Sequence, residues 1–214
     1  VVPTVPVSIG DDLEACAAED VDLVFAPAAE VLYPHGDPEV RIDPGQLGSI
    51  LEGAVRPGHF AGMLTVVVKL LQLTRPDATF FGEKDYQQLT LVRRMVTDLE
   101  LGVKVHGVPT VREADGLARS SRNAHLNPEE RTLAAAVPAA LAAGVSAADL
   151  GRSADAVVGA AELELMRVGL APDYVALTDP QLGPAPEVGA ARLLLATRVG
   201  RTRLIDNTPV TLRR

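Results

Sequence analysis

The sequence predicts an α/β protein in which a doubly wound parallel sheet is followed by a smaller α+β domain. Residues 79–81, 85–99 and 103–108 have the patterns of a strand, an amphipathic helix and a mostly buried strand, which is the order of a parallel βαβ unit. Beyond this unit the sequence becomes polar and then continues with helix-forming and strand-forming segments. We therefore expect one domain over residues 1–110 and a second over residues 111–214.

The first domain is expected to contain further elements before the βαβ unit. Residues 11–19 read as a helix and residues 21–25 as a short buried strand. Residues 33–58 are rich in Pro, Gly and Asp and predict a long irregular connection. Residues 60–75 are apolar on all sides and stop at Pro76, which predicts a helix buried against the sheet.

The second domain opens with a strong helix-start signal. Asn127 is a good N-cap, and it is followed by a proline at the first helical position and a glutamate at the third. We expect helices over residues 128–143, with a kink at Pro138, and over residues 154–167. Three strand-like runs follow, the last two joined as a hairpin through Gly200: residues 174–177, 193–197 and 202–205.

Composition excludes several classes of function. The chain of 214 residues carries a net charge of −8, which argues against a surface for nucleic acid or anionic lipid. The single cysteine, Cys16, excludes an internal disulfide and a cysteine-based metal site. No apolar stretch reads as a membrane span or an export signal. We expect a cytoplasmic protein without a membrane or nucleic-acid partner.

The first candidate site is the turn between the expected strand and helix of the βαβ unit. Ligands of open α/β sheets lie outside the carboxyl ends of the strands, and Gly82 and Lys84 fall at such an end. Lys84 offers a compact positive charge for a nucleotide phosphate, and Asp85 could accept ribose hydroxyls. The alternative is a surface turn whose charges are merely solvated.

A second cluster strengthens the nucleotide interpretation. Ser120, Ser121 and Arg122 supply two hydroxyl donors and a forked cation, a combination suited to a di- or triphosphate. Its alternative role is a loop that leads into the capped helix.

Other polar residues remain open to structural explanations. His59 lies at a loop-to-helix junction beside two glycines, where a capping or buried structural histidine is the competing interpretation. Glu52 and Arg56 could pair with each other or contact substrate. The remaining histidines show no metal-site spacing: His35, His106 and His125.

Together these motifs resemble the pantoate–β-alanine ligase (pantothenate synthetase) family. The residues that carry the resemblance occur in order and at the family's spacing: residues 51–53, 59–62, 80–88, 109–118, 120–123 and 202–207. The resemblance implies a Rossmann-like nucleotidyltransferase domain with a smaller lid domain. It also implies an ATP-dependent, homodimeric enzyme that joins pantoate to β-alanine through a pantoyl-adenylate, with Mg²⁺ on the phosphates and with AMP and pyrophosphate released.

The resemblance also implies a role for individual residues. Lys84 and Arg122 would be catalytic, through stabilisation of phosphate charge. Gln88 and His59 would bind pantoate, and Val111 would meet adenine through its backbone. Arg119 stands where the family usually has an apolar residue. The implied ATP-binding set is Gly82, Glu83, Lys84, Asp85, Val111, Arg119, Ser120, Ser121 and Arg122. No protein metal ligand is implied.

The N-terminal part departs from the family pattern. Residues 1–4 and 5–9 look like the ends of two family strands, and residues 10–13 look like the family sequence beyond the pantoate loop. The printed sequence lacks the family's His-x-Gly-His and Asn-Pro-x-Gln-Phe motifs. We expect that it joins pieces of a longer chain, which the intact mass tests.

Two alternatives to the ligase follow from the sequence. One is a naturally shortened relative that binds nucleotide without catalysis, as a binding or structural subunit. The other is an adenylyl-transferring enzyme for a different acid, which Gln88 and the Ser-Ser-Arg-Asn sequence at residues 120–123 disfavour.

Overall fold

The computed structural model describes residues 9–213, and the chain divides into two compact units, residues 1–41 and 42–214. The strand segments expected at residues 1–4 and 5–9 lie outside the described residues, except for Ile9, which begins a helix. The boundary expected at residue 110 falls inside the second unit and remains a prediction.

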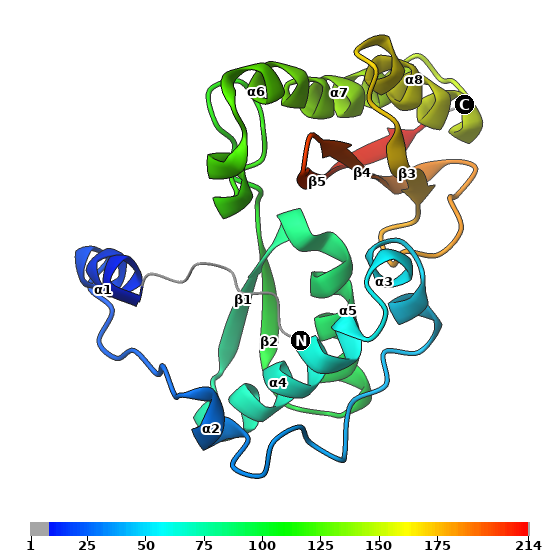
Figure 1. Ribbon diagram of the computed structural model, residues 1–214. Coiled ribbons are helices and arrows are strands. Elements are labelled where there is room, and N and C mark those ends of the chain that lie inside the picture. Colours follow the sequence, from blue (N-terminus) through cyan, green and yellow to red (C-terminus); the bar gives the residue numbers. More distant parts are fainter. Residues whose placement is uncertain (1–8, 214) are drawn as a thin grey trace. The chain divides into compact units, whose positions relative to one another are not determined.

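The first unit holds two helices, α1 (Ile9–Ala18) and α2 (Ala29–Leu32) (Figure 1). The helix expected at residues 11–19 is confirmed. The strand expected at residues 21–25 is wrong, because these residues are exposed and pair with no strand in the described part of the chain. A strand requires a neighbour that accepts and donates its backbone hydrogen bonds, and an apolar pattern alone does not supply one.

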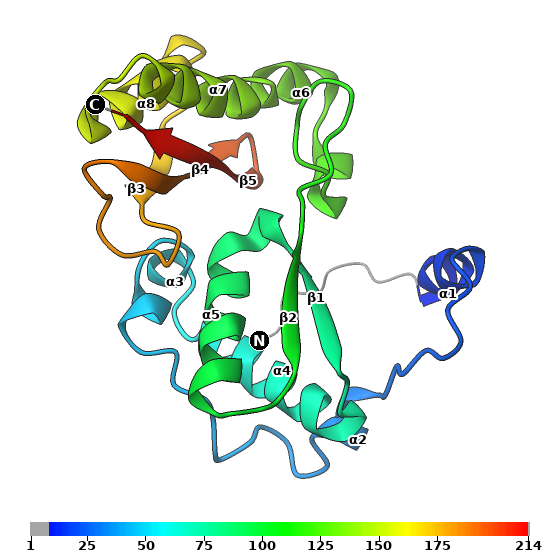
Figure 2. The ribbon, with the colours of Figure 1, turned by 180° about the vertical axis from the view of Figure 1, so that it is seen from behind.

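The second unit begins with the expected βαβ unit. Strands β1 (Ala78–Gly82) and β2 (Lys104–Val108) pair in parallel and are connected by helix α5 (Tyr86–Asp98), as Figure 2 shows. Helix α4 (His59–Thr74) precedes β1 and packs against α5, with Leu64 in the shared core. The α/β class predicted from the pattern is therefore confirmed.

The connection before α4 contains two short helical turns, η1 (Gln46–Ser49) and α3 (Glu52–Val55). The buried Gln87 amide of α5 fastens them. Its Nε2 donates to the Leu47 and Ile50 carbonyls at 2.7 and 2.9 Å. Its Oε1 accepts from the backbone N–H of Glu52 at 3.0 Å. This predicted irregular segment is consequently fixed on α5.

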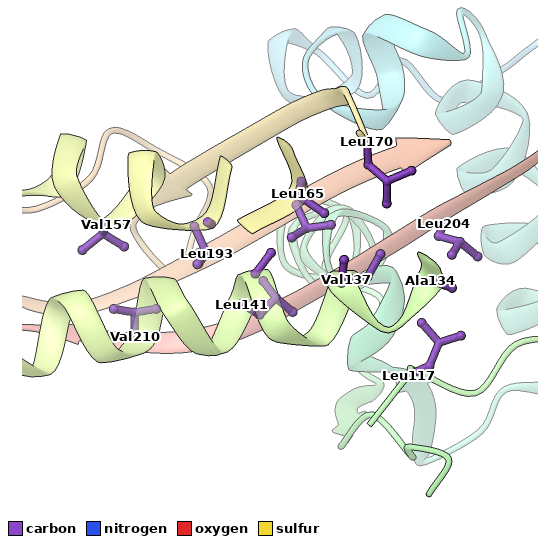
Figure 3. Packing of buried hydrophobic residues seen from close by; sticks show 14 of the residues in the cluster. Leu117, Ala134, Val137, Leu141, Val157, Leu165, Leu170, Leu193, Leu204 and Val210 are labelled. Atoms are coloured by element: carbon purple, nitrogen blue, oxygen red, sulfur yellow. The ribbon is translucent and has the colours of Figure 1, made fainter. Parts of the chain in front are cut away.

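The C-terminal part of the unit is a helical layer on one face of an antiparallel sheet with strand order β3-β4-β5 (Figure 1). Its core joins helix residues such as Val137 and Leu165 to the strand residue Leu193, all with no solvent exposure (Figure 3). The elements are α6 (Pro128–Ala134), α7 (Ala136–Asp149), α8 (Ala154–Arg167), β3 (Pro172–Thr178), β4 (Gly189–Val199) and β5 (Thr202–Leu212).

Local signals explain this layer. Asn127 and Glu130 form the expected capping box at the start of α6. The helix breaks at Ala135, because Pro138 lacks the N–H that would bond the Ala134 carbonyl. The expected hairpin forms between β4 and β5, and Gly200 takes the left-handed backbone (φ 55°) that its turn requires.

The sequence expectation about apolar length needs correction. In the described part of the chain, the stretch Pro128–Asp149 is long and apolar enough to cross a membrane by length and composition. It comprises α6 and α7, and its buried residues belong to the core against β4 and β5. That packing is the ordinary arrangement of a core helix.

Candidate functional site

A pocket in the second unit collects residues from seven elements, one of which is the turn after β1. The β3-β4-β5 sheet forms one side, and α3, the start of α4 and the start of α5 form the others. The polar and charged lining includes Glu52, Arg56, His59, Lys84, Asp85, Gln88, Tyr174 and Asn207. Four predicted site residues, Lys84, Asp85, Gln88 and His59, are therefore brought together.

The turn that carries Lys84 is a single 3-10 turn, η2 (Glu83–Asp85), placed between β1 and α5. Gly82 ends β1 directly before it. The ammonium group of Lys84 has no carboxylate partner among the described residues, and Asp85 makes no capping bond to α5. The charges of Lys84 and Asp85 are thus available to a ligand.

The backbone of this turn, in contrast, is firmly held. Asn207 Nδ2 donates to the carbonyls of Glu83 and Lys84 at 3.0 and 2.9 Å. The Glu83 carboxylate accepts from Arg192 Nη2 at 3.1 Å. The predicted ATP contact of Glu83 is therefore limited by an ion pair within the protein.

His59 and Arg56 form the opposite side of the pocket. Burial, and then the positive charge of Arg56, lower the pKa of His59, which favours the neutral imidazole. Burial, and then the charge of Arg122, lower the pKa of the Arg56 guanidinium. Arg122 is accordingly close enough to act on this side of the pocket electrostatically.

Glu52 does not pair with Arg56, one of the two possibilities that the sequence left open. The Arg203 guanidinium holds its carboxylate in a bidentate pair, at 2.6 and 2.8 Å. Tyr174 donates its hydroxyl to Glu52 Oε1 at 2.9 Å. Burial, and then the Glu52 charge, raise the pKa of Tyr174. Glu52 therefore binds the sheet to α3 and is not a free carboxylate.

The remaining predicted ATP residues lie on one folded segment outside the pocket lining. The backbone N–H of Arg119 donates to the Val111 carbonyl at 2.8 Å, which closes the segment into a loop. Ser120 Oγ accepts from the Arg122 N–H at 3.3 Å and caps η3 (Ser121–His125). The two candidate clusters of the sequence thus form two separate sides of one region, with Arg122 nearest to the pocket.

Sequence reasoning missed two arginines that complete the site, Arg192 and Arg203. Their partners Glu83 and Glu52 lie 109 and 151 residues earlier in the chain, so no local spacing reveals the pairs. The only sequence signal is that residues 202–207 belong to the segments that carry the family resemblance.

The fold and the site define a class of protein: an α/β chain with a polar pocket, lined by Lys84, at the carboxyl end of a parallel strand. The family model described as pantoate-beta-alanine ligase matches residues 3–209, so the chain belongs to the pantoate-beta-alanine ligase family.

Similar proteins carry the name of this enzyme. The chain is 56% identical to the pantothenate synthetase of Salinispora arenicola, covering 97% of this chain and 74% of that protein. It is 57% identical to the pantothenate synthetase of Nocardia farcinica, with 97% and 64% covered. The chain therefore spans about two thirds to three quarters of these relatives.

Solved structures agree with the fold. Pantothenate synthetase from Thermus thermophilus superposes with a TM-score of 0.89 at 45% identity, over 95% of this chain and 75% of that one. Pantoate-beta-alanine ligase from Francisella tularensis, solved with beta-gamma ATP and beta-alanine, superposes with a TM-score of 0.75 at 34% identity, over 95% and 70%.

Proposed function

We propose that the protein joins pantoate to β-alanine with ATP, through a pantoyl-adenylate, and releases AMP and pyrophosphate. The observation that carries the proposal is the convergence of Lys84, Asp85, Gln88 and His59 on one pocket. Pantothenate synthetases 52–57% identical to this chain support the same reaction and favour it over an inactive nucleotide-binding role.

In the first step a pantoate carboxylate oxygen attacks the α-phosphorus of ATP, and the bond to the β-phosphate oxygen breaks. Negative charge grows on the phosphate oxygens and on the departing pyrophosphate. In this proposal Lys84, which has no carboxylate partner among the described residues, stabilises that charge from one side, and Arg122 stabilises it from the other. The chain contributes mainly positioning and electrostatic stabilisation.

Pantoate is held by hydrogen bonds in this proposal. Gln88 is half-buried at the pocket and can donate and accept through its amide. His59, kept neutral by its lowered pKa, can accept a hydrogen bond from a pantoate hydroxyl. In the second step the β-alanine amine attacks the acyl carbon, AMP leaves, and the amine loses a proton to solvent.

Mg²⁺ enters this scheme as part of the substrate MgATP. Among the described residues no three His, Cys, Asp or Glu side chains converge on a point. Asp85 is the exposed carboxylate at the pocket that could meet water on the metal or a ribose hydroxyl.

The test uses the purified chain with MgATP and each acid or amine in turn. The proposal expects pyrophosphate release that depends on pantoate, and AMP and pantothenate when β-alanine is added. ATP binding without pyrophosphate release would favour the non-catalytic alternative. Equal turnover of another acid would favour a different adenylyl-transferring enzyme.

Two further parts of the proposal are a homodimer and a cytoplasmic location. The support for the dimer is the family resemblance, and the support for the cytoplasm is a lone cysteine that needs no oxidising compartment. Sedimentation equilibrium and fractionation of cells that carry a tagged chain test these parts.

A further inference from the structure

Two neighbouring residues of β5, Asp206 and Asn207, contact the loop that carries Arg122 and the turn that carries Lys84. Asp206 is 2% exposed and Asn207 is 3% exposed. Successive side chains of a strand point to opposite faces of the sheet. The strand itself packs against both η2, which carries Lys84, and η3, which carries Arg122. One strand is therefore in contact with both sides of the proposed ATP site.

Asn207 holds the lysine turn. Its Nδ2 donates to the Glu83 and Lys84 carbonyls, and its Oδ1 accepts from Arg192 Nε at 2.7 Å. The Arg192 guanidinium, 3.9 Å from the centre of the Tyr86 ring, also pairs with the Glu83 carboxylate. Every hydrogen-bonding atom of the Asn207 amide group is thus engaged in fixing the turn, and the Lys84 side chain is left free.

Asp206 holds the loop that carries the other cluster. Its carboxylate, with no solvent exposure, accepts from Arg112 Nη1 and Nη2 at 2.7 and 3.1 Å. Arg112 Nη1 also donates to the Gly116 carbonyl at 2.9 Å. Arg112 is the neighbour of Val111, whose carbonyl accepts from Arg119. The Asn207 N–H donates to Asp206 Oδ1 at 2.8 Å, and this bond links the Asn207 network to the Asp206 network.

We propose that Asp206 and Asn207 are positioning residues that set the lysine turn and the loop of residues 111–122 at a fixed separation, so that Lys84 and Arg122 reach one triphosphate. Buried polar networks with all groups satisfied are rigid, and a misplacement of about 1 Å can reduce a rate about 100-fold. The proposal rests on the proposed ligation, because that reaction requires the lysine turn and the loop of residues 111–122 to contact the same triphosphate.

The first test is Asn207→Asp. The variant keeps the size of the side chain and the acceptor for Arg192, but it sets a carboxylate oxygen against the Glu83 and Lys84 carbonyls. We expect faster amide hydrogen exchange in the peptide of residues 82–91 and a kcat for pyrophosphate release about 10- to 100-fold lower, with little change in the KM for pantoate. Asn127→Asp, the same change at an exposed helix cap, is the control and should alter neither value.

The second test changes the contact of Asp206 with Arg112 and leaves the bonds of Asn207 to the lysine turn in place. Arg112→Lys keeps the charge but loses the bidentate pair, and it should raise the KM for MgATP while the peptide of residues 82–91 exchanges as before. A purely structural network predicts lower unfolding temperatures with unchanged kcat and KM in the folded variants, and that result would overturn the proposal. Unchanged exchange in Asn207→Asp would overturn it as well.

The hydrogen-exchange measurement is informative whether or not the chain catalyses the proposed ligation. If the unsubstituted chain releases no pyrophosphate from pantoate and ATP, the proposed ligation fails, and MgATP affinity replaces kcat as the second measurement. Faster exchange with weaker MgATP binding in Asn207→Asp would then still support the positioning role. Faster exchange with unchanged affinity would refute it.

Discussion

The structure treats two groups of cations in this chain differently. One group binds carboxylates at 3.1 Å or less, in the sheet, in the loop before α6 and in α6 itself: Arg112, Arg131, Arg192 and Arg203. The other group surrounds the candidate site and has no carboxylate partner among the described residues: Arg56, Lys84 and Arg122. The first group holds the fold together, and the second is left open.

This difference does not come from a shortage of acids, since 28 Asp and Glu residues face 20 Lys and Arg residues. Arg56 and Arg122 repel one another, as the lowered pKa of Arg56, caused by burial and then by Arg122, indicates. Such an arrangement is unfavourable until an anion enters. We therefore expect a polyanion such as a triphosphate to bind at the unpaired group.

Replacement of Lys84 by alanine should have the largest effect. We expect pyrophosphate release to fall by about 100- to 1000-fold, because a charge aimed at the reacting phosphate is lost. The fold should persist, since only the backbone of Lys84 is used internally. Stopped-time pyrophosphate assays and circular dichroism measure the two expectations. Lys104→Ala, an exposed lysine on β2, is the control. An unchanged rate would remove Lys84 from the phosphate site.

Replacement of Arg203 by methionine should instead affect stability. Its side chain and that of Glu52 are 15% and 12% exposed, and loss of one partner leaves a largely buried carboxylate. We expect a loss of about 2–3 kcal/mol in the free energy of unfolding, measured by urea denaturation.

Arg198→Met changes an exposed arginine of the same sheet and is the matched control for Arg203. If both variants lost the same free energy of unfolding, the ion pair of Arg203 with Glu52 would not contribute specifically to stability. If the Arg203 variant kept its stability but lost catalysis, Arg203 would belong with the cations that are available to a ligand.

The sequence was sufficient wherever the signal was local. The range expected for α8 coincides with Ala154–Arg167, because Ser153 accepts from the Ala156 N–H and caps the helix. The lysine turn was predictable because a glycine separates a strand pattern from a helix pattern. Residues 21–25 were mispredicted because the existence of a strand depends on a partner elsewhere in the chain.

The division of these cations into paired and unpaired groups could not be predicted from the sequence. For Arg112, Arg192 and Arg203, pairing depends on a carboxylate more than 90 positions away. All these arginines look alike in a linear pattern. The sequence therefore identified Lys84 and Arg122 as candidates, but only the fold shows which other arginines are paired with carboxylates.

Replacement of Arg122 by alanine should give a smaller change than Lys84→Ala. We expect the KM for MgATP to rise about 10-fold and the KM for pantoate to stay nearly constant, because one charge-assisted contact to phosphate is lost. Initial rates with each substrate varied give both constants, and Arg201→Ala in the exposed hairpin turn is the control. A larger effect on pantoate than on ATP would reassign the loop of residues 111–122.

The smallest effect concerns His59 and the pH dependence of stability. Its pKa in the folded chain is lowered from the ordinary 6.5 by burial and then by Arg56. As the pH falls below about 6.5, the unfolded chain therefore gains a proton that the folded chain resists, and stability decreases. Between pH 7.5 and pH 5.5, His59→Gln should lose less unfolding free energy than the unsubstituted chain, measured by urea denaturation at both values. His35→Gln, an exposed histidine of the first unit, should retain the full pH dependence. Equal slopes in all three chains would show that the positive charge around His59 does not disfavour its protonation.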